Sequence, residues 1–220
     1  MTEAVLVSSI FFQEKDYPIF YQMYGKRLID VIFATILLII FCPVFFIIAI
    51  GIKLSSSGSV FFKQERVGKD GEPFTMLKFR SMDVNHKNGH KEFVTAYING
   101  KNKKNGINKL ENDSAIFLFG RIIRFFSLDE LPQLINVLKG NMSMVGPRPC
   151  TVYEWKAYNK LHKQRADILP GCTGLWQVDG RNAASFEEMI ALNLHYINKV
   201  SFLWDLFIII LTPWAMFKGI

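Results

Sequence analysis

Apolar residues are distributed unevenly along the chain, and their largest concentration lies near the N-terminus. The uncharged stretch from Val31 to Ile52 would be about 33 Å long as a helix, at about 1.5 Å per residue, which is enough to cross the hydrocarbon core of a membrane. A buried core helix is the alternative, and the length of the stretch disfavours it. Basic residues stand on both sides, Lys26 and Arg27 before the stretch and Lys53 after it.

Pro43 lies near the middle of this stretch, where proline removes a backbone hydrogen bond and clashes with the preceding turn. Each half of a helix broken there is too short to span a bilayer. Because both flanks are basic, the positive-inside rule is satisfied only if both ends face the cytoplasm. We therefore expect residues 25–54 to form a kinked, re-entrant helix that enters and leaves the membrane by the same leaflet.

The two ends of the chain carry weaker apolar signals. Residues 1–24 form an aromatic, partly amphipathic lead-in that lacks the basic start of a secretory signal. Near the other end, Trp204 and Trp214 flank an apolar run within residues 202–217. This run fits a helix at the level of the lipid headgroups or a core helix of a soluble domain, and both interpretations stay open.

Shorter patterns organise residues 55–220, which we expect to form a second domain. Two short strands are predicted, 60–66 and 73–80, around a turn at Gly68–Gly71. Three helices are predicted, over 127–139, 152–168 and 185–197, with Gly140 ending the first and Ser185 capping the last. Loops are predicted over 85–113, which is rich in Asn, Lys and Gly, and over the Gly-rich residues 170–182.

Helix outweighs strand in this pattern, so the expected fold class is α with minor β. The expected architecture is a re-entrant membrane helix plus a compact, helix-rich cytoplasmic domain with interfacial amphipathic helices.

The composition narrows the partners. Among 220 residues there are 26 Lys and Arg against 19 Asp and Glu, and the net charge of +7 favours phosphate groups, acidic lipid or nucleic acid. No motif that contacts DNA or RNA accompanies this charge, so nucleic acid is not an expected partner. The three cysteines form no C-x-x-C pair, which argues against a structural zinc site or a disulfide framework.

The segment Ser127-Leu-Asp129-Glu130 supports two interpretations. Ser127 and Glu130 have the spacing of a helix capping box, which is a purely structural device. Alternatively, Asp129 and Glu130 lie in the first turn of a helix, where an aspartate can attack phosphorus and the adjacent carboxylate can bind Mg²⁺. The two interpretations are compatible, because a capped turn would also hold the pair in place.

Basic residues in stiff turns favour the second interpretation. Lys78, Arg80, Arg148 and Arg181 each lie in or beside a short strand, a proline corner or a Gly-rich turn, and Arg124 precedes the acidic pair. A guanidinium held in one orientation suits bidentate binding of a phosphate group. Together these residues outline a pyrophosphate site.

Several motifs in order resemble the bacterial sugar transferases, specifically the small, monotopic polyprenyl-phosphate phosphoglycosyl transferases. The resemblance covers about residues 24–212. The motifs are Lys26-Arg27-x-x-Asp30, Phe62-x-Gln64-Glu65-Arg66-x-Gly68, Lys78-Phe79-Arg80-Ser81-Met82, Ser127-Leu-Asp129-Glu130-Leu-Pro132-Gln133, Asn136-Val-Leu-Lys-Gly140, Met142-Ser-Met-Val-Gly146-Pro147-Arg148-Pro149, Pro170-Gly171-x-Thr173-Gly174 and Gly180-Arg181-Asn182.

The resemblance implies a specific reaction. These enzymes transfer a phospho-sugar from a UDP-sugar to undecaprenyl phosphate, release UMP and begin a bacterial surface glycan at the cytoplasmic face of the inner membrane. The family's nucleophilic aspartate falls on Asp129, and its Mg²⁺-binding glutamate falls on Glu130. Substrate-binding positions fall on Lys78, Arg80, Arg124, Arg148 and Arg181.

Two departures and several alternatives remain. Asn141 and Asn193 stand where the family usually has Asp, so any metal or substrate role at these two positions is in doubt. A membrane-bound glycosyl transferase that releases UDP and a non-catalytic membrane scaffold are the competing functions. The sugar is left open, and so is a homodimer.

Overall fold

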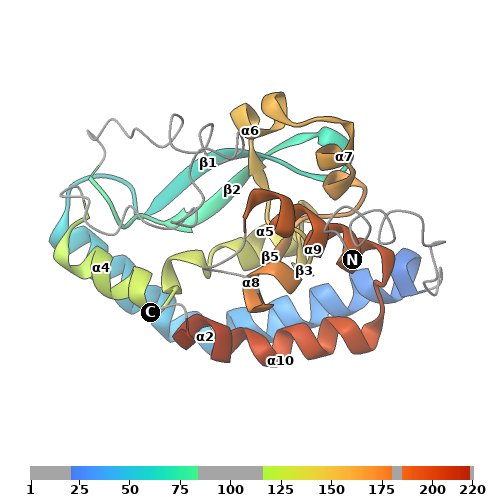
Figure 1. Cartoon of the computed structure of the whole chain (residues 1–220). Coiled ribbons are helices and arrows are strands. Elements are labelled where there is room, and N and C mark those ends of the chain that lie inside the picture. Colours follow the sequence, from blue (N-terminus) through green and yellow to red (C-terminus); the bar gives the residue numbers. More distant parts are fainter. Residues whose placement is uncertain (1–20, 84–115, 180–184, 219–220) are drawn as a thin grey trace.

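The computed structural model describes residues 21–83, 116–179 and 185–218. Over these ranges the chain is mostly helical, with two small sheets (Figure 1). The predicted fold class, α with minor β, is confirmed to that extent. The predicted lead-in lies mostly outside the described residues, apart from the π-helical turn η1 (Tyr21–Gly25). The predicted loop 85–113 lies outside them completely.

The apolar stretch near the N-terminus forms α2 (Lys26–Ser55), which contains Pro43. Its length and composition alone would allow it to cross a membrane. Only a few of its side chains are buried, among them Ala34, Ile48 and Ile52, whereas many large apolar side chains are exposed. The helix lies within one residue of the predicted segment 25–54 at each end, and its re-entrant course in a membrane stays a prediction.

The predicted hairpin is present and forms the first sheet. Strands β1 (Phe61–Val67) and β2 (Pro73–Phe79) are antiparallel and are joined through η2 (Lys69–Gly71). Strand β4 (Cys150–Thr151) pairs with the other side of β1, so the strand order is β2-β1-β4 and β2 lies at an edge.

The second sheet consists of β3 (Ser143–Val145) and β5 (Gly171–Thr173), which run parallel. The main chain beyond β3 approaches β5 closely, since a Cβ atom on Gly171 would lie 2.1 Å from the Gly146 nitrogen. This approach requires glycine at both positions. The predicted loop 170–182 was therefore wrong in part, because it contains β5 and α8 (Leu175–Asp179).

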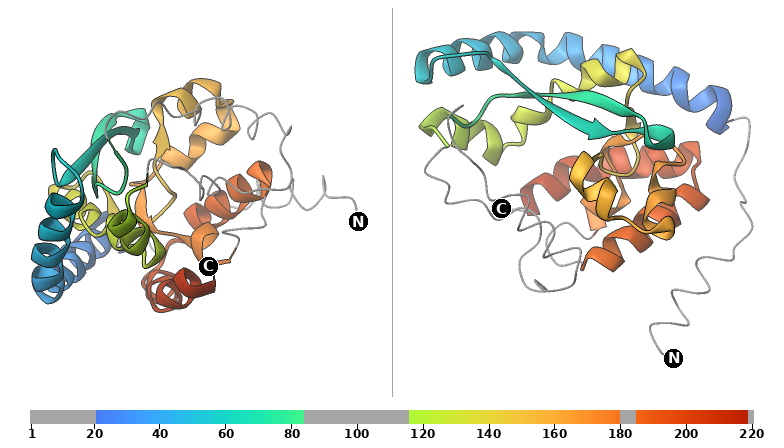
Figure 2. Two further views of the ribbon diagram at one scale, coloured as in Figure 1. Left: turned by 90° about the vertical axis from the view of Figure 1, so that its left-hand side faces the viewer. Right: turned by 90° about the horizontal axis from the view of Figure 1, so that it is seen from above.

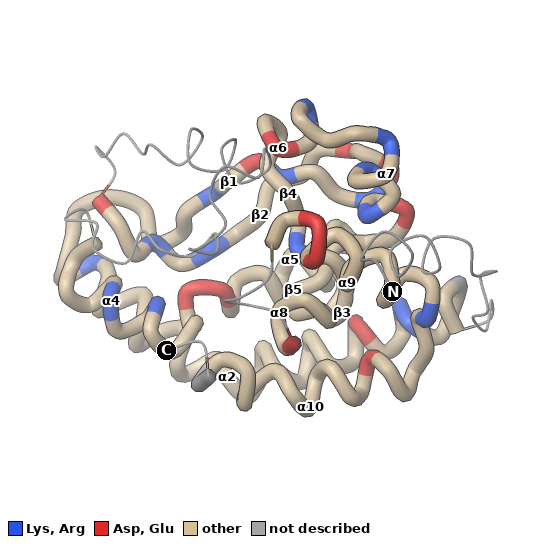
Figure 3. Tube along the Cα trace, in the orientation of Figure 1, with Lys and Arg blue, Asp and Glu red and all other residues tan. Residues whose placement is uncertain are grey.

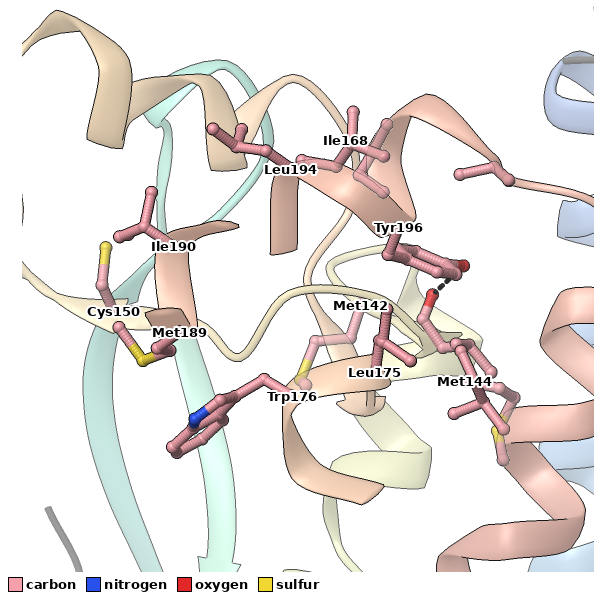
Figure 4. Close-up of a cluster of buried hydrophobic side chains, with 14 of the residues drawn as sticks. Met142, Met144, Cys150, Ile168, Leu175, Trp176, Met189, Ile190, Leu194 and Tyr196 are labelled. Carbon is pink, nitrogen blue, oxygen red and sulfur yellow. Dashed lines mark hydrogen bonds between the residues drawn. The ribbon is translucent and has the colours of Figure 1, made fainter. Parts of the chain in front are cut away.

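Helices surround the two sheets and contribute most of the core. The remaining helices and 3₁₀ turns are α4 (Leu118–Phe125), η3 (Leu128–Glu130), α5 (Gln133–Lys139), α6 (Val152–Ala157), α7 (Lys160–Lys163), η4 (Gln164–Ala166), α9 (Phe186–Asn198) and α10 (Phe202–Lys218). Figure 4 shows how side chains from β3, α8 and α9 meet, among them Met144, Leu175, Trp176, Met189 and Ile190.

One predicted helix is confirmed and two were wrong in their extent. Helix α9 begins after Ser185, which is its N-cap and forms a capping box with Glu188. The predicted helix 152–168 is instead α6, α7 and η4, because Tyr158 and Asn159 are extended and Asn159 caps a new helix. The predicted helix 127–139 is divided into η3 and α5, although Gly140 ends it as expected with a positive φ of 84°.

A buried ion pair joins the start of α2 to the start of α10. Lys26 Nζ lies 2.6 Å from Asp205 Oδ2, and both side chains are buried. The hydroxyls of Tyr196 and Tyr21 donate to the same carboxylate at 2.6 and 2.7 Å. The carboxylate is therefore fully supplied with donors, and the two apolar helices are tied together at one end.

Helices α2 and α10 both lie along the lower side of the molecule in Figure 1 and in the left view of Figure 2. Figure 3 shows long stretches without charge on both helices. The exposed apolar side chains of α10 include Phe202, Leu203, Phe207, Ile210 and Trp214. One side of α10 is nevertheless packed in the core through Ile208, as the core-helix interpretation expects, and a location at the lipid headgroups stays a prediction.

Candidate active site

Asp129 and Glu130 lie in a short turn between α4 and α5. Ser127 adopts the left-handed conformation with a φ of 52°, and its side chain makes no capping hydrogen bond. The predicted capping box at Ser127 was therefore wrong, because a helix N-cap needs an extended backbone. The Glu130 nitrogen instead donates to the Ser127 carbonyl at 3.2 Å, and this tight turn presents the two carboxylates.

Two basic residues from distant parts of the chain face Glu130. Lys78 Nζ on β2 donates to Glu130 Oε1 at 2.6 Å. Arg148 Nη2 lies 3.6 Å from the same oxygen. The structure thus brings together Lys78, Glu130 and Arg148, as the sequence predicted.

The same charged groups also shift the pKa of Asp129. Burial raises the pKa of Asp129, and the neighbouring Glu130 carboxylate raises it further, while Lys78, Arg124 and Arg148 lower it. The net direction is upward. Arg124 Nη1 also donates to Met82 Sδ at 3.4 Å. Cations around two carboxylates can bind a phosphate group next to an ionisable oxygen nucleophile.

Strand β2 is fixed to α5 by one side chain, and this contact places Lys78. The Leu77 nitrogen donates to Asn136 Oδ1 at 2.9 Å, and Asn136 Nδ2 donates to the Thr75 carbonyl at 2.8 Å. Asn136 is fully buried. Because Lys78 follows Leu77 directly, this amide sets the position of the ammonium group relative to the acidic turn.

The other predicted basic residues differ in placement. The buried Arg80 guanidinium donates to the Ser56 carbonyl at 2.7 Å and to the Ser57 carbonyl. Arg80 thus joins β2 to the end of α2, and its predicted contact with substrate stays a prediction. Arg181 lies outside the described residues.

The site offers carboxylate ligands to a divalent cation, but the described residues do not supply a complete coordination shell. Among the described residues no group of three or more His, Cys, Asp or Glu could hold a metal ion. Mg²⁺ usually takes one or two carboxylates together with substrate phosphates and water. The adjacent Asp129 and Glu130 fit that minimal requirement.

Sequence reasoning named Asn136 only as part of a motif and did not name Arg165, although both residues shape the site. Asn136 carried a usable signal, because it is a polar residue among the apolar positions of Gln133–Lys139. Arg165 is buried and donates to the Arg148 carbonyl at 2.6 Å. Nothing in the local pattern distinguishes it from the neighbouring surface lysines.

Comparisons with known proteins identify the family of the chain. The family model described as "Bacterial sugar transferase" matches residues 21–219. The chain is 37% identical over 188 residues to the "Exopolysaccharide production protein ExoY" of Rhizobium meliloti. The aligned region covers 86% of this chain and 83% of that protein.

Two longer relatives carry names that state a sugar. The chain is 41% identical over 200 residues to the "Galactosyl transferase CpsE" of Streptococcus agalactiae, covering 90% of this chain and 43% of that protein. It is 38% identical over 202 residues to the "UDP-glucose:undecaprenyl-phosphate glucose-1-phosphate transferase" of Escherichia coli, covering 88% of this chain and 40% of that protein. The chain thus spans less than half the length of these two.

Proposed function

Because this chain belongs to the bacterial sugar transferase family, we propose that it transfers a sugar 1-phosphate from a UDP-sugar to undecaprenyl phosphate and releases UMP. The product is an undecaprenyl-diphosphate-sugar. The observation that carries this proposal is the convergence of Lys78 and Arg148 on the Asp129–Glu130 turn. The different sugars named for the relatives leave the sugar open.

The reaction has two displacements. In the first, an Asp129 carboxylate oxygen attacks the sugar-proximal phosphorus, the phosphoanhydride bond breaks, and UMP leaves with the electron pair. In the second, an oxygen of the lipid phosphate attacks the same phosphorus and releases the Asp129 carboxylate. The aspartyl intermediate is a mixed anhydride, which is reactive enough for this second step. Lys78, Arg124 and Arg148 neutralise the charge that the transferred phosphoryl group carries.

Mg²⁺ would be held by Glu130, with phosphate oxygens of the substrate as further ligands. When bound, the ion supplies charge neutralisation of the pyrophosphate. The protein's own part is to fix Glu130 through Lys78, so that the carboxylate stays beside Asp129 when the substrate enters.

A lipid acceptor would account for the two apolar helices beside the catalytic site. We propose that α2 is re-entrant and that α2 and α10 place the site at the cytoplasmic surface of the inner membrane. The many exposed apolar side chains of both helices support this location, since exposure of this extent is unfavourable in water. A phosphate on a polyprenyl chain stays at the headgroup level, so an enzyme anchored there meets it directly.

The topology has a direct test. In a Cys42→Ser background, Gln22→Cys and Ser57→Cys variants are exposed singly to a membrane-impermeant maleimide in sealed vesicles of defined orientation. A re-entrant α2 predicts labelling of both from the cytoplasmic side. Labelling from opposite sides would show that α2 crosses the membrane.

The function is tested by measuring the released nucleotide across a panel of UDP-sugars with undecaprenyl phosphate. We expect UMP with at least one sugar and none with the Asp129→Asn variant. Release of UDP would identify a glycosyl transferase, and no release with any sugar would favour a scaffold.

The covalent intermediate has its own test. With labelled UDP-sugar alone, the enzyme should retain label and release one UMP per active site, whereas direct attack by the lipid leaves the protein unlabelled.

A further inference from the structure

The corner that carries Arg148 is immobilised at every carbonyl. Its two prolines, Pro147 and Pro149, have fixed φ angles and no N–H group. Three consecutive carbonyls each accept a hydrogen bond: Pro147 from the Gly171 nitrogen at 2.9 Å, Arg148 from Arg165 Nη2 at 2.6 Å, and Pro149 from Arg66 Nη1 at 3.1 Å. Two of the three donors are guanidinium groups.

Arg165 is held on its other side by Tyr158. Arg165 Nη1 donates to the Tyr158 hydroxyl at 2.9 Å, and the guanidinium carbon lies 5.7 Å from the centre of the same ring. Tyr158 is itself buried and packs against the rings of Trp155, His162 and Phe186. The Arg165 guanidinium therefore connects a rigid aromatic cluster to the main chain of Arg148.

Arg66 makes the equivalent connection from β1. Its Nε and Nη2 donate to Gln64 Oε1 at 3.1 and 2.7 Å, and its Nη1 lies 3.9 Å from Glu154 Oε2. Glu154 accepts in turn from the Thr151 main chain and hydroxyl. Arg66 is thus fixed before it bonds the Pro149 carbonyl.

We propose that Arg165 and Arg66 are positioning residues that hold the Arg148 main chain so that its guanidinium faces Glu130. The proposal rests on the proposed function, because it assigns Arg148 to the binding of the transferred phosphate. The three carbonyl bonds hold the main chain at Arg148, and Arg148 Nη2 lies 3.6 Å from Glu130 Oε1. Charge-assisted bonds of this kind are stronger than those between neutral groups.

Arginine is required at position 165 by geometry. Its planar fork reaches the Arg148 carbonyl and the Tyr158 hydroxyl with two different nitrogens, which the single ammonium of lysine does not reproduce. The Arg165→Lys variant keeps the charge and loses this geometry. The competing explanation is that Arg165 only stabilises the fold around η4.

A double-mutant cycle separates the two explanations. We compare kcat/KM for UMP release in the wild type, Arg165→Lys, Arg148→Lys and the double variant. If Arg165 acts through Arg148, Arg165→Lys lowers kcat/KM about tenfold in the wild type and less than about twofold in the Arg148→Lys background. Equal losses in both backgrounds would overturn the proposal. Arg66→Lys tests the same coupling from β1 and serves if Arg165→Lys does not fold.

Asn159→Ala is the matched control for stability. Asn159 Oδ1 accepts from the His162 nitrogen at 2.8 Å and caps α7, so its loss weakens the same region without touching Arg148. This variant should melt at a lower temperature with kcat/KM within about twofold of the wild type. If its kcat/KM falls as far as that of Arg165→Lys, the effect is structural and the proposal is overturned. A wild type that releases no UMP contradicts the proposed function instead.

Discussion

Lys78 Nζ and Glu130 Oε1 lie 2.6 Å apart, although 52 positions separate the two residues in the chain. The contact joins an edge strand to the acidic turn and keeps Glu130 beside Asp129. The positive charge next to the two carboxylates therefore depends on the position of β2.

Removing this ammonium group should impair catalysis more than folding. We expect Lys78→Met to lower kcat/KM for UMP release about 100-fold, since removal of one preorganised charged group that stabilises a transition state has roughly this effect. Lys63→Met is the matched control, because Lys63 is an exposed lysine on the same hairpin. Activity of Lys78→Met equal to that of the control would contradict the role of Lys78.

Asp129→Asn should abolish activity and stabilise the protein. Burial and Glu130 raise the pKa of Asp129, so at neutral pH the folded state bears the cost of an ionised carboxylate that the unfolded state does not. Each pKa unit corresponds to about 1.4 kcal/mol, and each 1 kcal/mol to about 2–4 °C for a chain of this size. A melting temperature higher than that of the wild type is therefore expected. A lower one would show that the carboxylate is net stabilising.

The pH dependence of UMP release follows from the same group. Asp129 attacks in its ionised form, so the rate should fall as the pH drops through a pKa above the ordinary aspartate value of about 3.9. Lys78 lowers this pKa, so Lys78→Met should move the acidic limb to higher pH. The measurement is a pH profile of kcat/KM for both proteins. An unmoved limb would separate Lys78 from Asp129.

The metal prediction uses the Glu130 carboxylate. Glu130→Gln keeps the size of the side chain and removes the charge that would bind Mg²⁺, so activity should collapse while circular dichroism stays unchanged. EDTA should silence the wild type, and added Mg²⁺ should restore it. A Gln variant that works normally in EDTA would exclude a metal role for Glu130.

The ion pair between α2 and α10 should dominate stability at that end of the molecule. Lys26→Met leaves the buried Asp205 without its cation, and removing one partner of such a pair costs about 3–5 kcal/mol. Replacing both, in Lys26→Met with Asp205→Leu, should cost less, because no charge is then left buried. Thermal melts in detergent compare the two. A double variant less stable than Lys26→Met would show that the pair stabilises beyond its charges.

The sequence predicted the parts of this protein that depend on short patterns. The hairpin around Gly68–Gly71, the cap at Ser185 and the helix end at Gly140 all follow from a few adjacent residues. The acidic pair and its basic partners were found because cations in stiff turns suit phosphate. How these residues come together in space depends on contacts between residues far apart in the chain, which short patterns do not predict.

The wrong predictions concern segments whose structure depends on contacts with distant residues. The Ser127 capping box failed because Ser127 has a left-handed backbone, and Glu130 instead pairs with Lys78, a residue that no local rule connects to it. The long helix predicted over 152–168 was interrupted at Tyr158 and Asn159, where a tyrosine is drawn into the core and Asn159 begins a new helix. Tertiary contacts overrode local preference in both cases.

The Asn136 amide has a consequence beyond the placement of Lys78. Strand β2 is the edge of its sheet, and edge strands expose main-chain groups that invite pairing with another chain. Asn136 occupies the Leu77 nitrogen and the Thr75 carbonyl as a neighbouring strand would. One side chain thus protects this edge against intermolecular association, and a substitution such as Asn136→Leu would leave a strand of the catalytic site open to aggregation.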